Sequence, residues 1–132
     1  MKIISFTWTT PALVAGRKTC TRRDWDKQYA QRFKAGDLVQ AWNKSPRAGK
    51  DARQVAVIRL TEAPSYEPMA QLPDSEYEAE GFAYLAERAL RGGGVVGNAS
   101  RESFEEWRGS GVSMWVVRFE QVLAFRREVC TD

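Results

Sequence analysis

The sequence predicts an α+β fold, a small and mainly antiparallel β-barrel with peripheral helices. The chain has 132 residues, of which 43% are hydrophobic and 11% aromatic, enough for one domain with a buried core. Segments with the pattern of strands alternate with short amphipathic stretches typical of helices. Few strands are spaced for parallel crossovers, which favours a barrel over an open parallel sheet. We expect a single domain spanning residues 1–132, with a frayed tail after about residue 126.

The first half predicts strands and short helices in alternation. Residues 2–8 alternate like a half-buried strand. A short helix follows, capped by Thr9 or Thr10, with Pro11 in its first turn and Gly16 at its exit. Asp24 is the expected cap of a second helix, whose aromatic stripe is Trp25, Tyr29 and Phe33. Strands are predicted at 37–42 and 54–61, with a turn-rich loop between them.

The second half predicts helices and one closing strand. Three prolines between residues 64 and 73 indicate an irregular connection. Ser75 and Glu78 have the spacing of a capping box, and the helix that they begin continues through Leu90. Gly92–Gly94 ends it, a shorter helix covers 100–107, and residues 112–125 form a last strand or pair of strands.

The composition excludes several kinds of site. The chain has no histidine, so His-based triads and His metal ligands are absent. Cys20 and Cys130 lie 110 positions apart without a CxxC spacing, which argues against a zinc or disulfide framework. We therefore expect no metal and no cofactor, and any catalysis has to use Lys, Thr, Ser, Cys, Asp, Glu or Tyr.

Charge is divided unevenly along the chain. Residues 1–60 hold 13 Lys and Arg against 4 Asp and Glu, a net charge of +9. The remaining residues hold 7 against 13, a net charge of −6. A basic half of this kind predicts contact with RNA or with a nucleotide or nucleoside. No apolar run approaches the ~20 residues of a membrane span, and we expect a cytoplasmic protein without a membrane partner.

The basic segment Arg17–Arg23 is the candidate functional centre. It combines Lys18 and Thr21 with three arginines. A threonine hydroxyl becomes a nucleophile when a base takes its proton, and a lysine with a lowered pKa can be that base. In a regular strand, however, residues three apart face opposite sides. A shared site therefore requires a turn or bulge between Lys18 and Thr21.

The same segment resembles a family signature. Ala15–Arg23 is similar to the G-x-K-T-x-x-x-R pattern of the ASCH domain family. Three later stretches agree in order with that family: Lys34–Val39 as the start of a strand, Glu78–Phe82 as an acidic helix start, and Trp115–Phe119 as a closing strand.

The resemblance implies a PUA-like β-barrel, a fold associated with RNA binding. Some ASCH proteins are amidohydrolases that deacylate N4-acetylcytidine, and others are described as ribonucleases. Resemblance to the amidohydrolases implies catalytic roles for Lys18, Thr21 and Glu80, with Glu78 as the alternative acid. The segment 91–110 resembles an insertion relative to the shorter deacylases.

Binding without turnover is the alternative hypothesis, with a ribonuclease as a further one. In such a module the cations would hold phosphate, Thr21 would bond a base edge and Glu80 would accept from an exocyclic amine. Trp8 and Trp42 are candidates for base stacking, although single tryptophans on strands more often belong to the core. The cations predicted to contact phosphate are Arg17, Arg22, Arg23, Arg47 and Lys50.

Overall fold

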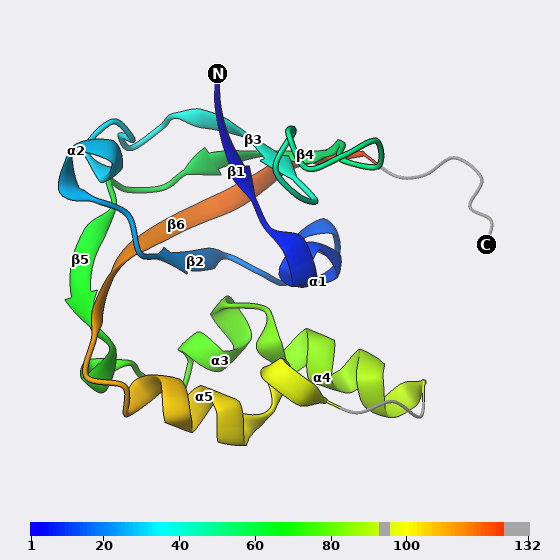
Figure 1. Ribbon diagram of the computed structural model, residues 1–132, viewed down its shortest axis with the longest axis vertical. Coiled ribbons are helices and arrows are strands. Elements are labelled where there is room, and N and C mark those ends of the chain that lie inside the picture. The colour runs from blue at the N-terminus through cyan, green and yellow to red at the C-terminus, as the bar shows by residue number, and fades with distance from the viewer. Residues whose placement is uncertain (93–95, 126–132) are drawn as a thin grey trace.

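The computed structural model describes residues 1–92 and 96–125 (Figure 1). Its strands are β1 (Lys2–Ser5), β2 (Cys20–Arg23), β3 (Leu38–Trp42), β4 (Gln54–Leu60), β5 (Ser65–Pro68) and β6 (Ser113–Ala124). Its helices are α1 (Thr10–Val14), α2 (Lys27–Ala30), α3 (Glu76–Ala79), α4 (Phe82–Arg91) and α5 (Arg101–Arg108). Turns of 3-10 helix occupy Thr7–Thr9, Met69–Gln71 and Gly97–Ala99.

The strands form one curled sheet organised by β6. The strand order is β1-β3-β4-β6-β2, and β5 also pairs with β6. The pair β1–β3 is parallel, whereas the other pairs are antiparallel. The C-terminal half of β6 pairs with β4, and its N-terminal half pairs with β2 and β5. The resulting half-barrel with peripheral helices confirms the predicted α+β class and is consistent with a small PUA-like barrel.

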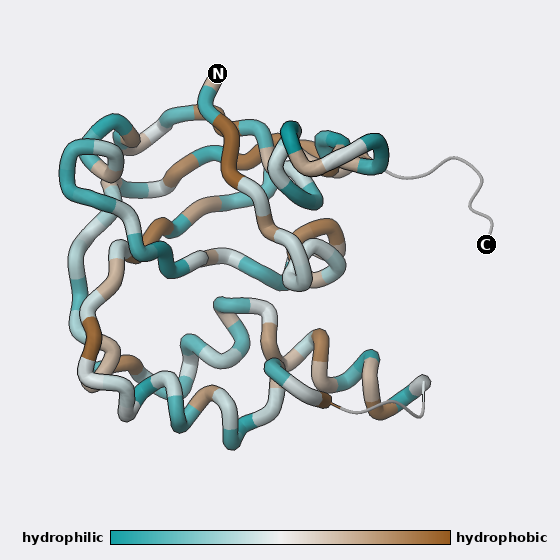
Figure 2. Tube along the Cα trace, viewed as in Figure 1, coloured by the Kyte–Doolittle hydropathy of each residue, from teal (hydrophilic) through white to brown (hydrophobic). Residues whose placement is uncertain are grey.

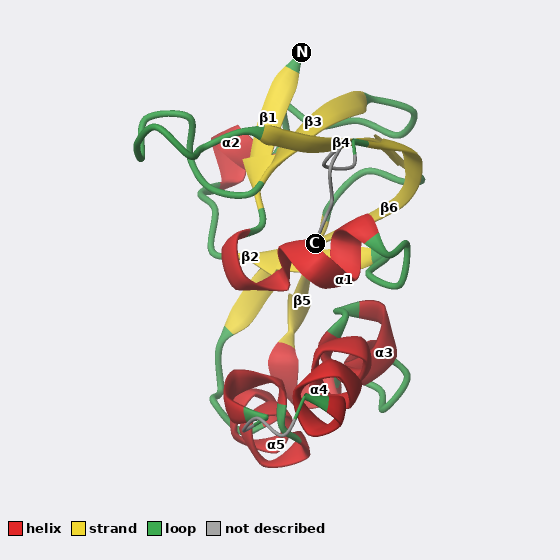
Figure 3. Ribbon diagram, turned by 90° about the vertical axis from the view of Figure 1, so that its right-hand side faces the viewer, coloured by secondary structure: helices red, strands yellow, loops and turns green. Residues whose placement is uncertain are grey.

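The molecule has two layers, a sheet layer and a helical layer of α3, α4 and α5, and each contains a hydrophobic cluster. The larger lies inside the curl of the sheet, where strand residues such as Ile58 and Val117 pack with Leu13 of α1 and Phe33. The second joins α3, α4 and α5 around Phe82 and Phe104. Figures 1 and 3 show these three helices gathered on one side of the sheet. Apolar residues lie along β1, and apolar and polar residues alternate along α4 (Figure 2).

The second helix is shorter than the sequence predicts. α2 covers Lys27–Ala30, and its cap is Asp26, whose side chain accepts from the Tyr29 amide at 2.8 Å. Asp24 was the predicted cap, and it lies before the helix. The aromatic stripe nevertheless packs as expected, because Trp25 stacks on Phe33 with ring centroids 4.8 Å apart and both join the larger cluster.

The proline-rich connection contains a strand that the sequence did not predict. β5 covers Ser65–Pro68 and pairs with Ser113–Val116 of β6. Three of the four residues of β5 are exposed, and the strand carries too little apolar alternation to be recognised from the sequence. Part of the basic segment is also a strand, since β2 begins at Cys20.

The helix predicted from Ser75 to Leu90 is divided at Gly81. This glycine has φ of 90°, which ends α3, and α4 begins at Phe82. A Cβ on Gly81 would lie 2.6 Å from the Ala12 Cβ and 3.2 Å from the Lys18 Cβ. Only a glycine gives this conformation and lets α1 approach so closely. Ser75 itself is helical, and its side chain makes no capping bond.

Some sequence predictions fall on residues outside the described part. The expected frayed tail after residue 126 lies there, with Cys130 and most of the glycine run at 92–94. Among the helices of residues 1–92 and 96–125, we find none with the length and apolarity to cross a membrane.

Candidate functional site

A cavity of about 230 Å³ lies where the sheet layer meets the helical layer. Its polar walls come from the basic segment and the end of α3, and its aromatic walls come from both layers. The residues that line it are Phe6, Thr7, Trp8, Thr9, Lys18, Thr21, Arg22, Arg23, Glu80, Phe82 and Trp107. The structure thus brings Lys18, Thr21 and Glu80, predicted as a site from the sequence, to one cavity.

A turn at Gly16 comes just before Lys18. Gly16 has φ of 79°, and the amides of Arg17 and Lys18 both donate to the Ala12 carbonyl, at 3.0 and 3.1 Å. Lys18 precedes β2, which begins at Cys20, and the Thr19 carbonyl already accepts from the Phe119 amide of β6 at 3.0 Å. The prediction that a turn or bulge must lie between Lys18 and Thr21 is therefore not confirmed: the turn lies before Lys18, and both side chains line the cavity.

The side chain of Lys18 is buried and makes two hydrogen bonds, both to Glu80. Its side chain is 1% exposed, and Nζ donates to the Glu80 carbonyl oxygen at 2.8 Å and to Glu80 Oε1 at 3.2 Å. Glu78, the alternative acid, lies on the surface and pairs with Arg17 at 2.7 Å. The left-handed turn at Gly81 separates α4 from this part of the chain and leaves Glu80 facing Lys18.

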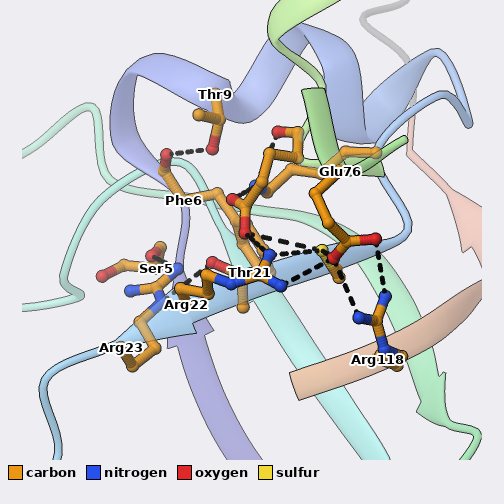
Figure 4. Close-up of polar contacts among 11 residues, drawn as sticks. Ser5, Phe6, Thr9, Thr21, Arg22, Arg23, Glu76 and Arg118 are labelled. Carbon is orange, nitrogen blue, oxygen red and sulfur yellow. Dashed lines mark hydrogen bonds and ion pairs between the residues drawn. The ribbon is translucent and has the colours of Figure 1, made fainter. Parts of the chain in front are cut away.

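Glu80 also belongs to a chain of ion pairs with Arg22, Glu76 and Arg118, and Figure 4 labels these last three. Arg22 Nη1 donates to Glu80 Oε2 at 2.7 Å, and Arg22 Nη2 donates to Glu76 Oε1 at 2.7 Å. Arg118 from β6 donates to the same Glu76 oxygen at 2.8 Å. The cluster links α3 to two strands, and its members Lys18, Arg22 and Arg118 supply three cations against two carboxylates.

The pairing lowers the pKa of Glu76 and raises that of Arg22. Burial opposes ionisation of Glu76, but hydrogen bonds from Arg118 and Arg22 outweigh it and lower the pKa of Glu76 below its ordinary value of 4.5. Burial likewise lowers the pKa of Arg22, and attraction to Glu80 outweighs this and raises it. Guanidinium groups keep their proton in proteins, so Arg22 and Arg118 remain cationic in this cluster.

Thr21 has an oriented hydroxyl on the cavity wall. Arg23 Nε donates to Thr21 Oγ1 at 3.0 Å, and Arg23 Nη2 donates to the Ser5 carbonyl at 2.8 Å. A hydroxyl that accepts one bond still has its own proton to donate. Burial lowers the pKa of Arg23.

The two predicted stacking residues have different places. Trp8 lines the cavity, is 47% exposed and stacks on Phe82 with centroids 5.4 Å apart. Trp42 is half-buried on β3, where its indole N–H donates to Gln40 Oε1 at 2.9 Å. Trp8 is therefore the one positioned for a ligand in this cavity.

The predicted phosphate contacts do not form one surface. Arg22 and Arg23 line the cavity with their side chains already bonded to protein oxygens. Arg17 is engaged by Glu78 at the surface. Arg47 and Lys50 are exposed on the loop between β3 and β4, which lies at the opposite end of the molecule from α5 (Figures 1 and 3). Their contact with phosphate stays a prediction.

Several residues of the site were not predicted from the sequence. Glu76 stands one helical turn before Glu80, and this i, i+4 spacing was the available signal that both face the same way. No local pattern connects Arg118 or Trp107 to the basic segment. These residues meet it through the antiparallel pairing of β6 with β2 and through the position of α5.

Cys20 lies inside the ion-pair cluster. It is fully buried, and its Sγ is 3.5 Å from both Glu76 Oε1 and Glu80 Oε2. Burial first, and then the charge of Glu80, raise the pKa of this thiol. A protonated thiol is a weak nucleophile, so Cys20 is a packing residue and a weak hydrogen-bond donor here.

A solved structure supports the fold. The chain is similar to the crystal structure of protein EF3133 from Enterococcus faecalis V583, of the family DUF984, with a TM-score of 0.58 and 20% sequence identity. The match covers 96% of this chain and 82% of that one. Neither a family model nor a curated protein matches the sequence. At this identity the similarity establishes the fold alone.

The described residues contain no group of three or more Cys, Asp or Glu side chains with the geometry to hold a metal ion. Glu76 and Glu80 share their oxygens with arginine and lysine. The polar side chains that line the cavity are those of Lys18, Arg22, Arg23, Glu80 and three threonines, Thr7, Thr9 and Thr21.

Proposed function

We propose that this protein is an ASCH-type amidohydrolase that removes the acyl group from an N4-acylated cytosine nucleoside. The observation that carries the proposal is the convergence of Lys18, Thr21 and Glu80 on one cavity. Lys18 and Thr21 match the resemblance residue for residue, and Glu80, 59 positions after Thr21, is the one of the two candidate acids that contacts Lys18. The structural similarity to a DUF984 protein adds support, since DUF984 is an ASCH-like family.

The cavity has the parts that amide hydrolysis requires. In the proposed reaction, Thr21 Oγ1 attacks the acyl carbonyl carbon while Lys18, in its neutral form, takes the hydroxyl proton. The C–N bond then breaks, and the proton passes to the exocyclic amine, which leaves as free cytidine. Water hydrolyses the Thr21 ester, releasing the carboxylic acid and restoring the hydroxyl.

The remaining polar groups have roles that follow from their contacts. Glu80 holds the lysine through its carbonyl and Oε1, so it acts as a positioning residue and balances the lysinium that forms during attack. Arg23 already donates to Thr21 Oγ1, which places a cation next to the oxygen that attacks and to the negative charge that develops on the carbonyl. Trp8 and Phe82 offer aromatic faces for the base.

Incubation with N4-acetylcytidine tests the proposal. We expect release of cytidine and acetate by the wild-type protein, and loss of at least about 10³-fold in kcat for Lys18→Met and Thr21→Val, the scale of removing a general base or nucleophile. Arg17→Met is the matched control, because Arg17 is a cation of the same segment whose partners lie on the surface. It should retain activity.

Two results would contradict the proposal. Wild-type protein that leaves a series of N4-acyl cytidines intact is not this amidohydrolase. Cytidine binding by such inert protein, weakened by Thr21→Val, would instead support the module that binds without turnover. Equal activity of the Lys18→Met and Arg17→Met variants would remove Lys18 from the chemistry.

A further inference from the structure

A second cavity adjoins the first and belongs largely to the helical layer. Its volume is about 450 Å³, and its residues are Trp8, Phe82, Asn98, Ser103, Phe104, Glu106 and Trp107. Trp8, Phe82 and Trp107 also line the first cavity, so the two cavities share an aromatic wall. This second cavity is built by the segment 96–107, within the part of the chain that resembles an insertion.

The second cavity combines aromatic faces with hydrogen-bonding groups. Trp8 stacks on Phe82, and Phe82 contacts Trp107 with centroids 5.8 Å apart. Asn98 and Glu106 are exposed at its edge. Within residues 1–92 and 96–125, no cation forms an ion pair with Glu106, which leaves its oxygens free to accept from a ligand. A sugar fits this combination, because its C–H face packs on aromatic rings and its hydroxyls donate to carboxylate and amide oxygens.

The charges next to the cavities disfavour a phosphate. The described residues that line the second cavity include the acidic Glu106 and no lysine or arginine. The cations of the first cavity, Lys18, Arg22 and Arg23, are already bonded to protein oxygens. A phosphoryl group at the sugar would therefore meet a carboxylate without a compensating cation, and the repulsion lowers affinity.

We propose that the second cavity is the ribose subsite of this protein and that it selects an unphosphorylated nucleoside over the free base, the nucleotide and RNA. The inference rests on the proposed function for the position of the base: the acylated amine lies at Thr21 in the first cavity, and the sugar extends past Trp8 and Trp107 toward Glu106. A long hydrocarbon acyl chain is a poorer occupant, since it would desolvate Glu106 without giving it a donor.

Three substrates and one pair of variants test the subsite. N4-acetylcytosine, N4-acetylcytidine and N4-acetylcytidine 5′-monophosphate are compared by kcat/KM. We expect the nucleoside to exceed both others by about tenfold, the effect of one or two hydrogen bonds made or one like-charge contact avoided. Glu106→Gln should reduce the ratio of kcat/KM for the nucleoside to kcat/KM for the nucleotide, and Glu106→Lys should make the nucleotide the better substrate. Glu102→Lys, an acidic residue of the same helix that does not line this cavity, is the control.

The outcomes separate the subsite from the chemistry. Hydrolysis of all three substrates at equal kcat/KM, or equal effects of Glu106→Lys and Glu102→Lys, overturns the subsite while the amidohydrolase stands. Wild-type protein inert toward all three overturns the amidohydrolase. The subsite is then decided by calorimetric titration with cytidine, cytosine and cytidine 5′-monophosphate: preferential binding of cytidine that Glu106→Lys abolishes supports it, and its absence overturns it.

Discussion

Replacing Gly81 with alanine is the most specific test of how the fold builds the site. The residue has φ of 90°, and its added Cβ would lie 2.6 Å from the Ala12 Cβ. An L residue in this left-handed region costs about 1–2 kcal/mol. Forcing a methyl group into a close-packed contact costs about 1–3 kcal/mol more. We expect Gly81→Ala to lower the free energy of unfolding by about 2–5 kcal/mol, measured by urea denaturation.

Gly36 supplies the matched control for this prediction. Its φ is 88°, but a Cβ built on it meets no atom within 4 Å. Gly36→Ala should therefore cost only the conformational part, about 1–2 kcal/mol. Adding Ala12→Gly to Gly81→Ala removes the clashing methyl and should recover the packing part, giving a coupling of about 1–3 kcal/mol in a double-mutant cycle. Equal losses for Gly81→Ala and Gly36→Ala, without coupling to Ala12, would refute the argument from close approach.

Three further predictions concern the buried cluster. Glu76→Gln removes the carboxylate that the buried Arg22 and the partly exposed Arg118 both contact, and it should lower the free energy of unfolding by about 3–5 kcal/mol. The exposed Glu78→Gln should cost at most about 1 kcal/mol, and comparable values for both would contradict the prediction. Because the pKa of Glu76 is lowered in the fold, its stabilisation is complete above its ordinary value of 4.5 and is lost as the pH falls through the folded pKa. Denaturation curves from pH 6 to 3 should therefore show a smaller loss of stability in Glu76→Gln than in wild type, and parallel loss would refute this. Cys20 is fully buried and the pKa of its thiol is raised. In a Cys130→Ser variant, we therefore expect Cys20 to resist alkylation at pH 8 in the native protein and to react after unfolding. Rapid labelling of the native protein would refute the burial of Cys20.

The local parts of the fold were predictable because they depend on neighbouring residues. The pattern of β-branched residues at 54–61 predicted β4, and Pro11 with Gly16 predicted the short α1. The cluster at Trp25, Tyr29 and Phe33 followed from helical spacing, although the helix itself is one turn long. β5 and the break at Gly81 were not predictable in this way. β5 is fixed by pairing with β6, and the break by the approach of α1, and both involve residues distant in the sequence.

The residues of the site likewise include some that were predictable from the local sequence and some that only the tertiary structure brings together. The order of residues in Arg17–Arg23 determined that Lys18 and Thr21 lie close in the chain, but not that both would line one cavity, because strand alternation alone predicts opposite faces. The tertiary structure decided which acid they meet. It placed Glu80 on Lys18 and Glu78 on Arg17, and it paired cations of the basic half with carboxylates of the acidic half. The charge division seen along the sequence is thereby partly neutralised in space, since ion pairs depend on distances that only packing sets.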